Sequence, residues 1–287
     1  MGCRMEIVYL DQDTVEYFTD YIGEDAAENI GRMYYNGFIV RKDDEPVAGI
    51  IWQLRNVVTG KEKESRIVFL RIDDDKAQDI LFEYYESAIA REEVGKSTFV
   101  LPAASSAKEK AALENAGFTA GLMEGDIIKA RLSDVAELAL MEKTKISSDV
   151  LPISSLSQGD FAAAIRRFAQ RGLYGLCEDL IYLPKTYFEN EVSCYVGSSG
   201  GINGLMLLHK LPSGALSIII MACIGEDYAR ILPKMMRRVL SSALERYSPD
   251  TEIMIDRHNY SVLALSEKLF PSGFGIPVYQ GSRTEKK

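Results

Sequence analysis

Residues 38–56 read FIVRKDDEPVAGIIWQLRN, and the fold follows from this stretch. Two apolar runs flank an acidic turn that holds Asp43 and Asp44, which predicts an antiparallel hairpin. Residues 65–72, SRIVFLRI, predict a third strand, and residues 76–92 carry apolar side chains at helical spacing. The elements expected next are a strand at 97–103, a helix at 107–117 and a strand at 118–132. This order predicts an α+β fold in which helices flank a mixed, mostly antiparallel sheet.

The same order of elements recurs in the second half of the chain. Residues 192–211, VSCYVGSSGGINGLMLLHKL, predict a second hairpin, and residues 216–224 predict a buried strand. The elements expected next are a helix at 228–247, a strand at 251–257, a helix at 261–270 and a closing strand at 273–281. Each half also opens with a helical stretch, at 14–35 and at 159–176. The chain is therefore expected to contain an internal repeat.

Equivalent positions in the two halves keep a nearly constant spacing. The spacing is 155 between Gly49 and Gly204, 151 between Leu81 and Leu232, and 156 between Phe118 and Phe274. Such a small drift corresponds to loops of different length. The segment KISSDVLPIS, which begins at Lys145, breaks the pattern. We therefore expect an N-terminal domain at 1–145 and a C-terminal domain at 151–287.

Charge is distributed unevenly between the two halves. The chain carries 33 Lys and Arg against 42 Asp and Glu, a net charge of −9. The first 150 residues hold 18 basic and 29 acidic side chains, hence −11, whereas the rest hold 15 and 13, hence +2. An acidic chain argues against general nucleic-acid binding, which needs a basic surface. A small anionic ligand would prefer the second half, and the acidic half is interpreted as a well-solvated surface.

Composition and cysteine spacing are typical of a globular protein of the cytoplasm. The longest apolar run, Ile218 to Ile224, is far shorter than the ~18 residues of a membrane helix, and the N-terminus has no secretory core. The four cysteines are widely spaced, which indicates reduced thiols. With His209 and His258 as its only histidines and no CxxC pair, the chain offers almost no ligands for structural zinc. A carboxylate site for a single metal ion stays open.

The order helix, hairpin, long strand, helix, strand, helix ending in Gly-Phe, strand resembles the GCN5-related N-acetyltransferase (GNAT) superfamily. The duplication resembles its tandem members, and the resemblance covers nearly the whole chain. Its most specific pieces are LENAGF at 113–118 and SEKLFPSGF at 266–274, which are similar to the family segment YEKLGF. The resemblance implies two tandem GNAT-like domains that transfer an acetyl or other acyl group from acetyl-CoA to a small amine. It implies no metal, and a homo-oligomer stays open.

The resemblance also locates a cofactor site. In the family, acetyl-CoA docks where the long central strand and the next strand splay apart, and its pyrophosphate sits on backbone amides at the start of the following helix. The family loop there is Gln/Arg-x-x-Gly-x-Gly/Ala, which neither half matches. The first-half turn, RIDDDKAQDI, has Asp73, Asp74 and Asp75 in place of glycines. We expect these carboxylates to cap the helix and repel a pyrophosphate, so the first domain is expected to lack the cofactor site.

The second-half turn, CIGEDYARIL, keeps features that suit CoA. Gly225 would let the backbone turn sharply, Arg230 could reach a phosphate, and the amides at 227–230 could cradle the anion. Asn259 follows the strand IMIDRH, where the family often has an Asn against the pantetheine arm. The full set implied for cofactor binding is Ala222, Cys223, Ile224, Gly225, Tyr228, Ala229, Arg230 and Asn259. Alternatively, Glu226 and Asp227 cap the helix, and its basic residues form a solvated face.

Acetyl transfer needs a neutral amine and a proton for the leaving thiolate. In the family a Tyr on the last helix often supplies that proton, but alignment puts Leu113 and Ser266 at its position. Ser266 is therefore the candidate in the second half. Glu178, beside Asp179, is the candidate base for the amine. The alternative for these two residues is an acidic pair in an exposed loop.

Two rival interpretations stay open. Cys223, His258 and Asp256 lie at the expected ends of neighbouring strands and could form a thiol-imidazole-carboxylate set. The alternative for Cys223 is an inert buried thiol. The second rival is a non-catalytic member that binds CoA, another anion or a protein partner. The departures from the glycine loop and from the tyrosine favour this second rival.

Overall fold

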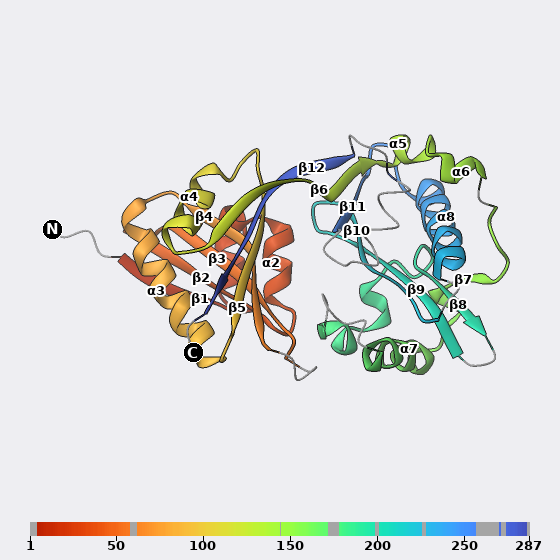
Figure 1. Ribbon diagram of the computed structural model, residues 1–287, viewed down its shortest axis with the longest axis horizontal. Helices are drawn as coiled ribbons and strands as arrows, with labels where there is room; N and C mark the ends of the chain where they lie inside the picture. Colours follow the sequence, from red (N-terminus) through yellow and green to blue (C-terminus); the bar gives the residue numbers. More distant parts are fainter. Residues whose placement is uncertain are drawn as a thin grey trace. The chain divides into compact units, whose positions relative to one another are not determined.

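The computed structural model describes residues 5–57, 62–143, 145–171, 178–198, 201–225, 228–256, 270 and 274–285. The chain forms two compact units (Figure 1). Unit 1 consists of Met1–Glu124 together with Pro277–Lys287, and unit 2 consists of Gly125–Ile276. The domain boundary expected at 145–151 falls inside unit 2, and the last residues of the chain belong to unit 1. Among the described residues, no helix combines the length and the apolar character needed to cross a membrane.

Unit 1 contains the strand order β1-β2-β3-β4-β5-β12. The strands are β1 Met5–Leu10, β2 Tyr35–Lys42, β3 Glu45–Arg55, β4 Glu64–Ile72, β5 Lys96–Pro102 and β12 Gly275–Thr284. Only β4 and β5 pair in parallel; the other described pairs of this unit are antiparallel. The predicted hairpin is confirmed, and its turn places Asp43 and Asp44 at φ +50° and +72°. Aspartate tolerates this left-handed backbone better than most residues, which explains the acidic turn.

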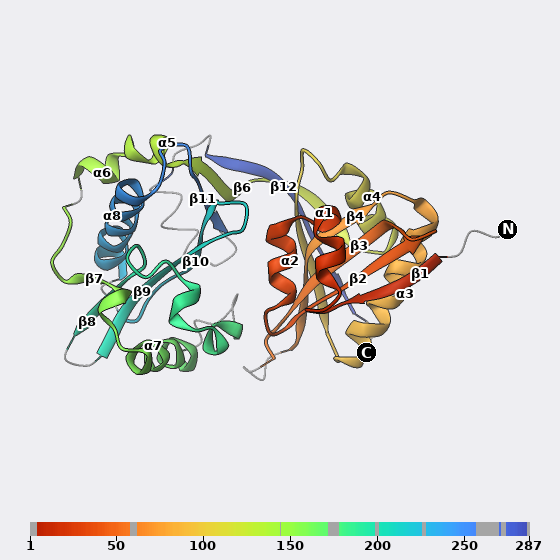
Figure 2. The same cartoon turned by 180° about the vertical axis from the view of Figure 1, so that it is seen from behind.

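Helices cover both faces of the unit 1 sheet (Figures 1 and 2). The elements are the 3-10 helix η1 Val15–Phe18, α1 Thr19–Ile22, α2 Glu24–Ile30, α3 Asp75–Arg91 and α4 Ala107–Asn115. The helical stretch expected at 14–35 is divided into three short pieces, because Gly23 with φ +85° interrupts it. Helix α3 buries Ala77, Leu81, Tyr85 and Ile89, a stripe at helical spacing, against the sheet.

Unit 2 contains the strand order β6-β11-β10-β9-β8-β7. Its strands are β6 Thr119–Arg131, β7 Val150–Pro152, β8 Cys194–Ser198, β9 Gly201–Lys210, β10 Leu216–Cys223 and β11 Glu252–Asp256. Its helices are α5 Leu132–Ala136, α6 Ala139–Lys143, η2 Ile153–Ser155, α7 Gln158–Gln170, η3 Glu178–Tyr182, η4 Lys185–Tyr187 and α8 Tyr228–Arg246. Helices α7 and α8 pack on opposite faces of the sheet, against separate apolar clusters. Of the helix expected at 261–270, the structure describes only Phe270.

Two strands run from one unit into the other, and each completes a sheet made mainly by the opposite half of the chain. The closing strand of the second half, β12, pairs in antiparallel fashion with β5 of unit 1, from Val278↔Pro102 to Thr284↔Lys96. The last strand of the first half, β6, pairs with β11 of unit 2. The sequence shows that these segments are strands but not which edge they join, because period-two alternation carries no information about the partner.

Close packing in unit 1 fixes the position of β12. A Cβ atom on Gly281 would lie 1.7 Å from the carbonyl oxygen of Thr119, so only glycine fits there. The Arg283 side chain is 13% exposed and forms an ion pair of 2.6 Å with Glu86 of α3. The same guanidinium donates to the Ala116 carbonyl oxygen at 2.6 Å, at the end of α4. These contacts anchor the C-terminal strand to the helices of unit 1.

Candidate functional site

The central strand of unit 2 has a bulge close to its parallel neighbour. Within the described residues, strands β10 and β11 pair in parallel from Leu216↔Ile253 to Ile218↔Ile255. Immediately beyond Ile218, β10 has a β-bulge against β9. As a result, Ile219 and Ile220 are both half-buried against the apolar cluster under α7, instead of alternating between the faces. The bulge lies in the strand where the family resemblance predicts a divergence.

Unit 1 has the same construction at the equivalent residues. Strands β4 and β5 pair in parallel up to Ile67↔Phe99, and β4 has a bulge at the next residue, Val68, against β3. Val68 and Phe69 then lie on the same face, in the cluster under α1 and α2. Ile67 and Ile218 are 151 residues apart, from 218 minus 67, which is the spacing predicted from Leu81 and Leu232. The internal repeat is therefore confirmed residue by residue in the central strands.

The strand register corrects one predicted equivalence. Cys223 pairs with Gly204, and its equivalent Ile72 pairs with Ala48. Gly204 therefore corresponds to Ala48 and not to Gly49, with a spacing of 156. The one-residue error arose because both positions hold a small residue, and sequence similarity alone does not fix the register between strands. A Cβ on Gly204 would lie 3.2 Å from the Cys223 Sγ, so a small residue is required here.

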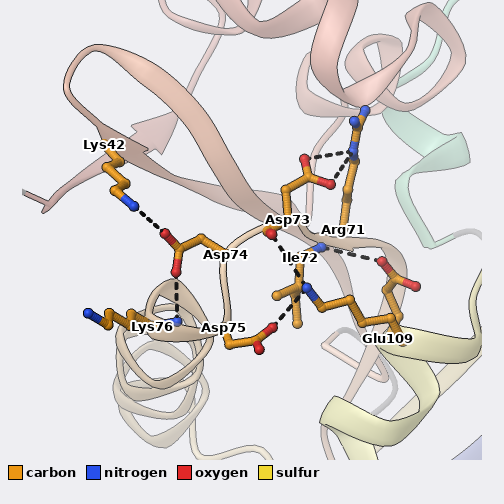
Figure 3. A network of polar contacts seen from close by, with 9 residues as sticks. Lys42, Arg71, Ile72, Asp73, Asp74, Asp75, Lys76 and Glu109 are labelled. Atoms are coloured by element: carbon orange, nitrogen blue, oxygen red, sulfur yellow. Dashed lines mark hydrogen bonds and ion pairs between the residues drawn. The ribbon is translucent and has the colours of Figure 1, made fainter.

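In the turn after β4 of unit 1, backbone amides donate hydrogen bonds to oxygen atoms of the protein itself (Figure 3). The backbone amides of Asp73 and Asp74 both donate to the Val47 carbonyl oxygen, at 2.8 and 3.2 Å. The Asp74 carboxylate accepts from the Lys76 amide at 2.9 Å and pairs with the Lys42 ammonium at 2.6 Å. The bond from Lys42 lowers the pKa of Asp74. Asp74 thus caps α3, and the predicted capping role is confirmed for this residue.

Further ion pairs close the same turn from both sides (Figure 3). Arg71 lies 3.1 Å from Asp73, and Lys108 lies 2.8 Å from Asp75. The buried carboxylate of Glu109 accepts from the Ile72 amide at 3.3 Å, where β4 ends. An anion at this helix start would meet three aspartates, and several of the amides it needs already have acceptors. This arrangement is the geometry expected of a turn without a pyrophosphate site.

The turn after β10 in unit 2 has no equivalent of Arg71, Asp73 or Asp74, whereas Asp75 corresponds to Glu226, which lies outside the described residues. The spacing of 151 matches Arg71, Asp73 and Asp74 to Ala222, Ile224 and Gly225. Gly225 is exposed and has φ +109°, and no atom of the described residues lies within 4 Å of the place that a Cβ would occupy. Only glycine adopts this backbone readily, so the residue is needed for the turn itself. Helix α8 then begins at Tyr228, and Ala229 and Arg230 in its first turn are exposed.

The remaining predicted cofactor residues are placed as follows. Ala222 is buried on the α7 face, whereas Cys223 is a half-buried cysteine at the end of β10. The Ile224 amide donates to the Asn203 carbonyl oxygen at 2.7 Å. Asn259, the two acidic residues at 226 and 227, and the side chain of Tyr228 lie outside the described part of the chain.

The predicted catalytic residues lie mostly outside the described residues. Glu178 begins η3, but its side chain is not described, and neither is Ser266. Asp179, next to Glu178, is fully buried at 0% exposure, so it is not the exposed loop residue that the alternative interpretation expects. The rival thiol set is untested, because His258 and the side chain of Asp256 are also outside.

The basic residues farther along α8 are engaged within unit 2. Lys234 lies 3.5 Å from Asp149 and donates to the Ser147 hydroxyl at 3.2 Å. Arg237 donates to the Ser241 hydroxyl at 2.9 Å. These side chains stabilise the helix and its neighbours, whereas Arg230 is exposed beside the open turn.

Sequence reasoning missed two residues beside this turn, Arg167 on α7 and Asn203 on β9. The Arg167 Nη2 donates to the Asn203 Oδ1 at 3.1 Å. A signal was present, because Asn203 is a polar residue in an otherwise apolar strand, directly before Gly204. Among the described residues, no group of three or more His, Cys, Asp or Glu side chains could hold a metal ion.

These features together define the fold of the chain, which is a tandem GNAT fold. Similar solved structures include a tandem GNAT protein from the clavulanic acid biosynthesis pathway, with 10% identity, a TM-score of 0.64 and 99% of each chain covered. A GCN5-related glucosamine N-acetyltransferase region of a fungal multi-domain GH3 β-N-acetylglucosaminidase is 11% identical, with a TM-score of 0.62, over 99% of this chain and 38% of that one.

A GCN5-related N-acetyltransferase from Kribbella flavida is 12% identical, with a TM-score of 0.53, over 98% of this chain and 71% of that one. At such identities the likeness establishes the fold. No protein-family model matches the chain, and no curated protein matches its sequence.

Proposed function

We propose that unit 2 binds acyl-CoA and transfers the acyl group, most simply acetyl, to a small amine. The observation that carries this proposal is the contrast between the two turns. In the unit 1 turn, Asp73 and Asp74 are held by Arg71, Lys42 and the Lys76 amide, while the positions equivalent to Arg71, Asp73 and Asp74 in unit 2 hold Ala222, Ile224 and Gly225. The solved structures with similar folds are titled as GNAT proteins or N-acetyltransferases, which supports the same reaction class.

In this proposal the pyrophosphate lies at the start of α8. Unpaired amides and the helix dipole favour an anion at a helix N-terminus, and α8 is long enough, at 19 residues, for a full dipole. Arg230, exposed in the first turn, would pair with a phosphate, and Ala229 would leave room for it. The acyl arm would run along β10 beyond Ile218, past the bulge.

The chemistry that follows is direct acyl transfer. The amine lone pair attacks the thioester carbonyl carbon, a C–N bond forms, and the C–S bond breaks to release CoA thiolate. We assign Glu178 to accept a proton from the amine and Ser266 to donate one to the thiolate. We further propose that unit 1 binds no acyl-CoA and serves as scaffold, and that the protein acts in the cytoplasm with reduced thiols, as the free Cys194 and Cys223 suggest.

A second candidate is a non-catalytic module that binds CoA, another anion or a protein partner. The sequence observation that favours it is the replacement of the family tyrosine by Leu113 and Ser266. Release of free CoA from acetyl-CoA in the presence of an amine panel separates the two candidates. An enzyme releases thiol only with an amine present, whereas a binding module shifts the melting temperature and releases none.

The first test is binding of CoA and acetyl-CoA by calorimetry and thermal shift. Ligand at a hundred times Kd should stabilise the protein by about 2.7 kcal/mol. Arg230→Glu should abolish this shift, while Arg166→Glu, at an exposed arginine of α7, should keep it. Unchanged affinity in Arg230→Glu would refute the site assignment. Absence of any shift in the wild-type protein at millimolar ligand would refute the proposed function.

A further inference from the structure

The guanidinium of Arg167 lies at the end of the unit 2 sheet where β9 begins and β10 ends. Arg167 lies in the last turn of α7, and its Nη2 donates to the Asn203 Oδ1 at 3.1 Å. Its Nη1 lies 2.3 Å from the place that a Cβ of Gly201 would occupy. The absence of a side chain at Gly201 therefore lets the guanidinium lie directly over the first residue of β9.

Asn203 connects this arginine to the turn. Its side chain accepts from α7, and its own carbonyl oxygen accepts from the Ile224 amide at 2.7 Å. Ile224 immediately precedes Gly225, so this bond is the last contact between β9 and β10 before the chain turns toward α8. A single residue thus joins helix α7 to the backbone of the proposed pyrophosphate turn.

Helix α7 is itself fixed on the sheet face beside the divergent strands. Phe161, Ile165 and Phe168 are buried at helical spacing in the same apolar cluster as Leu205 and Ala222. Any shift of α7 along the sheet would therefore act on Asn203 through Arg167.

Unit 1 makes the equivalent connection in a different way. With the spacing of 156, Asn203 corresponds to Val47, whose carbonyl oxygen accepts from the Asp73 and Asp74 amides. The connection to helix α1 comes from Arg71. Its side chain donates to the Tyr21 carbonyl oxygen at 3.2 Å and stacks on the Tyr21 ring at 4.4 Å. In unit 1 the connecting side chain belongs to the central strand β4 itself, whereas in unit 2 it belongs to Asn203 on the neighbouring strand β9.

We propose that Arg167 is a positioning residue, which holds the Ile224–Gly225 backbone through Asn203 in the geometry that binds the CoA pyrophosphate. The inference rests on the proposed function of unit 2. It predicts that α7 position and CoA affinity are linked, although Arg167 itself need not contact the cofactor. Loss of the tie should weaken CoA binding without removing any group from the turn.

The test is the Kd of CoA for Arg167→Ala, Asn203→Leu and the double variant, measured by calorimetry on the full chain. Each single change should weaken binding roughly 5- to 30-fold, because a hydrogen bond to a charged group is lost. The double variant should be no weaker than the worse single variant, since both remove the same connection. Arg167→Lys should restore part of the affinity, and Arg166→Ala should match the wild type.

A purely structural role would lower the melting temperature of the ligand-free protein and leave the Kd of the folded fraction unchanged. Amide exchange at Ile224 in the ligand-free protein should be faster in Arg167→Ala if the tie positions the turn. Should Arg167→Ala fail to fold, Asn203→Leu alone decides the question. CoA binding by the wild type with Kd values within twofold in Arg167→Ala or Asn203→Leu would overturn the inference. A wild type that binds no CoA would instead overturn the proposed function.

Discussion

The two strand-to-helix turns follow equivalent positions in a repeated fold but carry different side chains. At the end of β4, Arg71 pairs with Asp73, while Asp74 pairs with Lys42 and accepts from the Lys76 amide of α3. After β10, the equivalent positions carry Ala222, Ile224 and Gly225. The backbone course of a turn can therefore be the same in two copies of a domain, while a few side chains determine whether the protein's own groups occupy it.

The comparison also separates fold from function within one molecule. Both central strands have the bulge, at Val68 and at Ile219. These features are thus properties of the fold in both units and do not by themselves indicate a cofactor site. The chemistry of the turn is the feature that differs, and the following predictions address it from the largest expected effect to the smallest.

Gly281→Ala should have the largest effect, on unit 1. The new Cβ would meet the Thr119 carbonyl oxygen and the Phe99 ring, so β12 could not keep its place beside β5. We expect the free energy of unfolding of unit 1 to fall by about 3 kcal/mol. Denaturant titration followed by fluorescence measures this, because Trp52, the only tryptophan, is buried in unit 1.

Gly121→Ala is the matched control, because no atom lies within 4 Å of its added Cβ. It should change the unfolding midpoint little. Equal midpoints for Gly281→Ala and the wild type would contradict the assignment of β12 to unit 1.

Gly225→Asp should give the unit 2 turn the carboxylate that Asp74 provides in unit 1. A negative charge next to the pyrophosphate should weaken CoA binding roughly tenfold relative to Gly225→Asn. The asparagine variant is the control for shape and for the strained backbone at φ +109°. The ratio of the two Kd values, measured by calorimetry, gives the effect of the negative charge alone on CoA affinity. A ratio near one would show that a carboxylate in this turn does not prevent CoA binding, contrary to the comparison between the turns.

Asp74→Asn should have a small effect on unit 1 that depends on pH. The pKa of Asp74 is lowered, mainly by the bond from Lys42, so its ionised form stabilises the folded state above the unfolded pKa of about 3.9. That contribution disappears as pH falls through the lower folded pKa. The wild type should therefore melt a few degrees above Asp74→Asn at pH 7, by about the amount of a weak surface interaction, and at the same temperature near pH 2.

A melting difference between the two proteins that persists unchanged in acid would show that the charge of Asp74 is not what stabilises this turn. CoA affinity should be the same in both proteins at pH 7, since the proposed site lies in unit 2.

Cys223→Ala should have the smallest effect on acyl transfer. The half-buried thiol ends β10 beside Gly204, and the proposed direct transfer uses no thiol nucleophile. Turnover and CoA affinity should stay within about twofold of the wild type, because replacing one partly buried side chain changes little else. Loss of turnover in a folded variant with normal CoA affinity would favour the rival set with His258 and Asp256.

The sequence predicted those parts of the fold that depend on local pattern. The hairpin around Asp43 and Asp44, the helix capped at Asp74 and the repeat spacing of 151 were all accessible from residue periodicity and turn chemistry. The short first strand, Met5–Leu10, was missed because six residues with mixed polarity give a weak signal. The partner of β12 was also missed, since strand pairing across such a separation depends on the whole sheet.

The candidate site, too, could be predicted only in those parts that depend on local sequence. The capping aspartates could be predicted because helix starts prefer such residues, and Gly225 because only glycine suits its backbone. The tie from Arg167 to Asn203 could not be predicted, because 36 residues separate them and no local rule pairs a helix side chain with a strand side chain.

Unit 1 is built from two separate parts of the chain, because β12 follows its other strands by more than 170 residues. The sheet of unit 1 lacks β12 while the chain from Pro102 to Pro277 is synthesised. This synthesis takes on the order of ten seconds at typical translation rates. During that interval β5 presents an unpaired edge, the kind of surface that invites association with other chains. The newly made protein should therefore be more prone to aggregate, and more dependent on chaperones, before its final strand emerges than after.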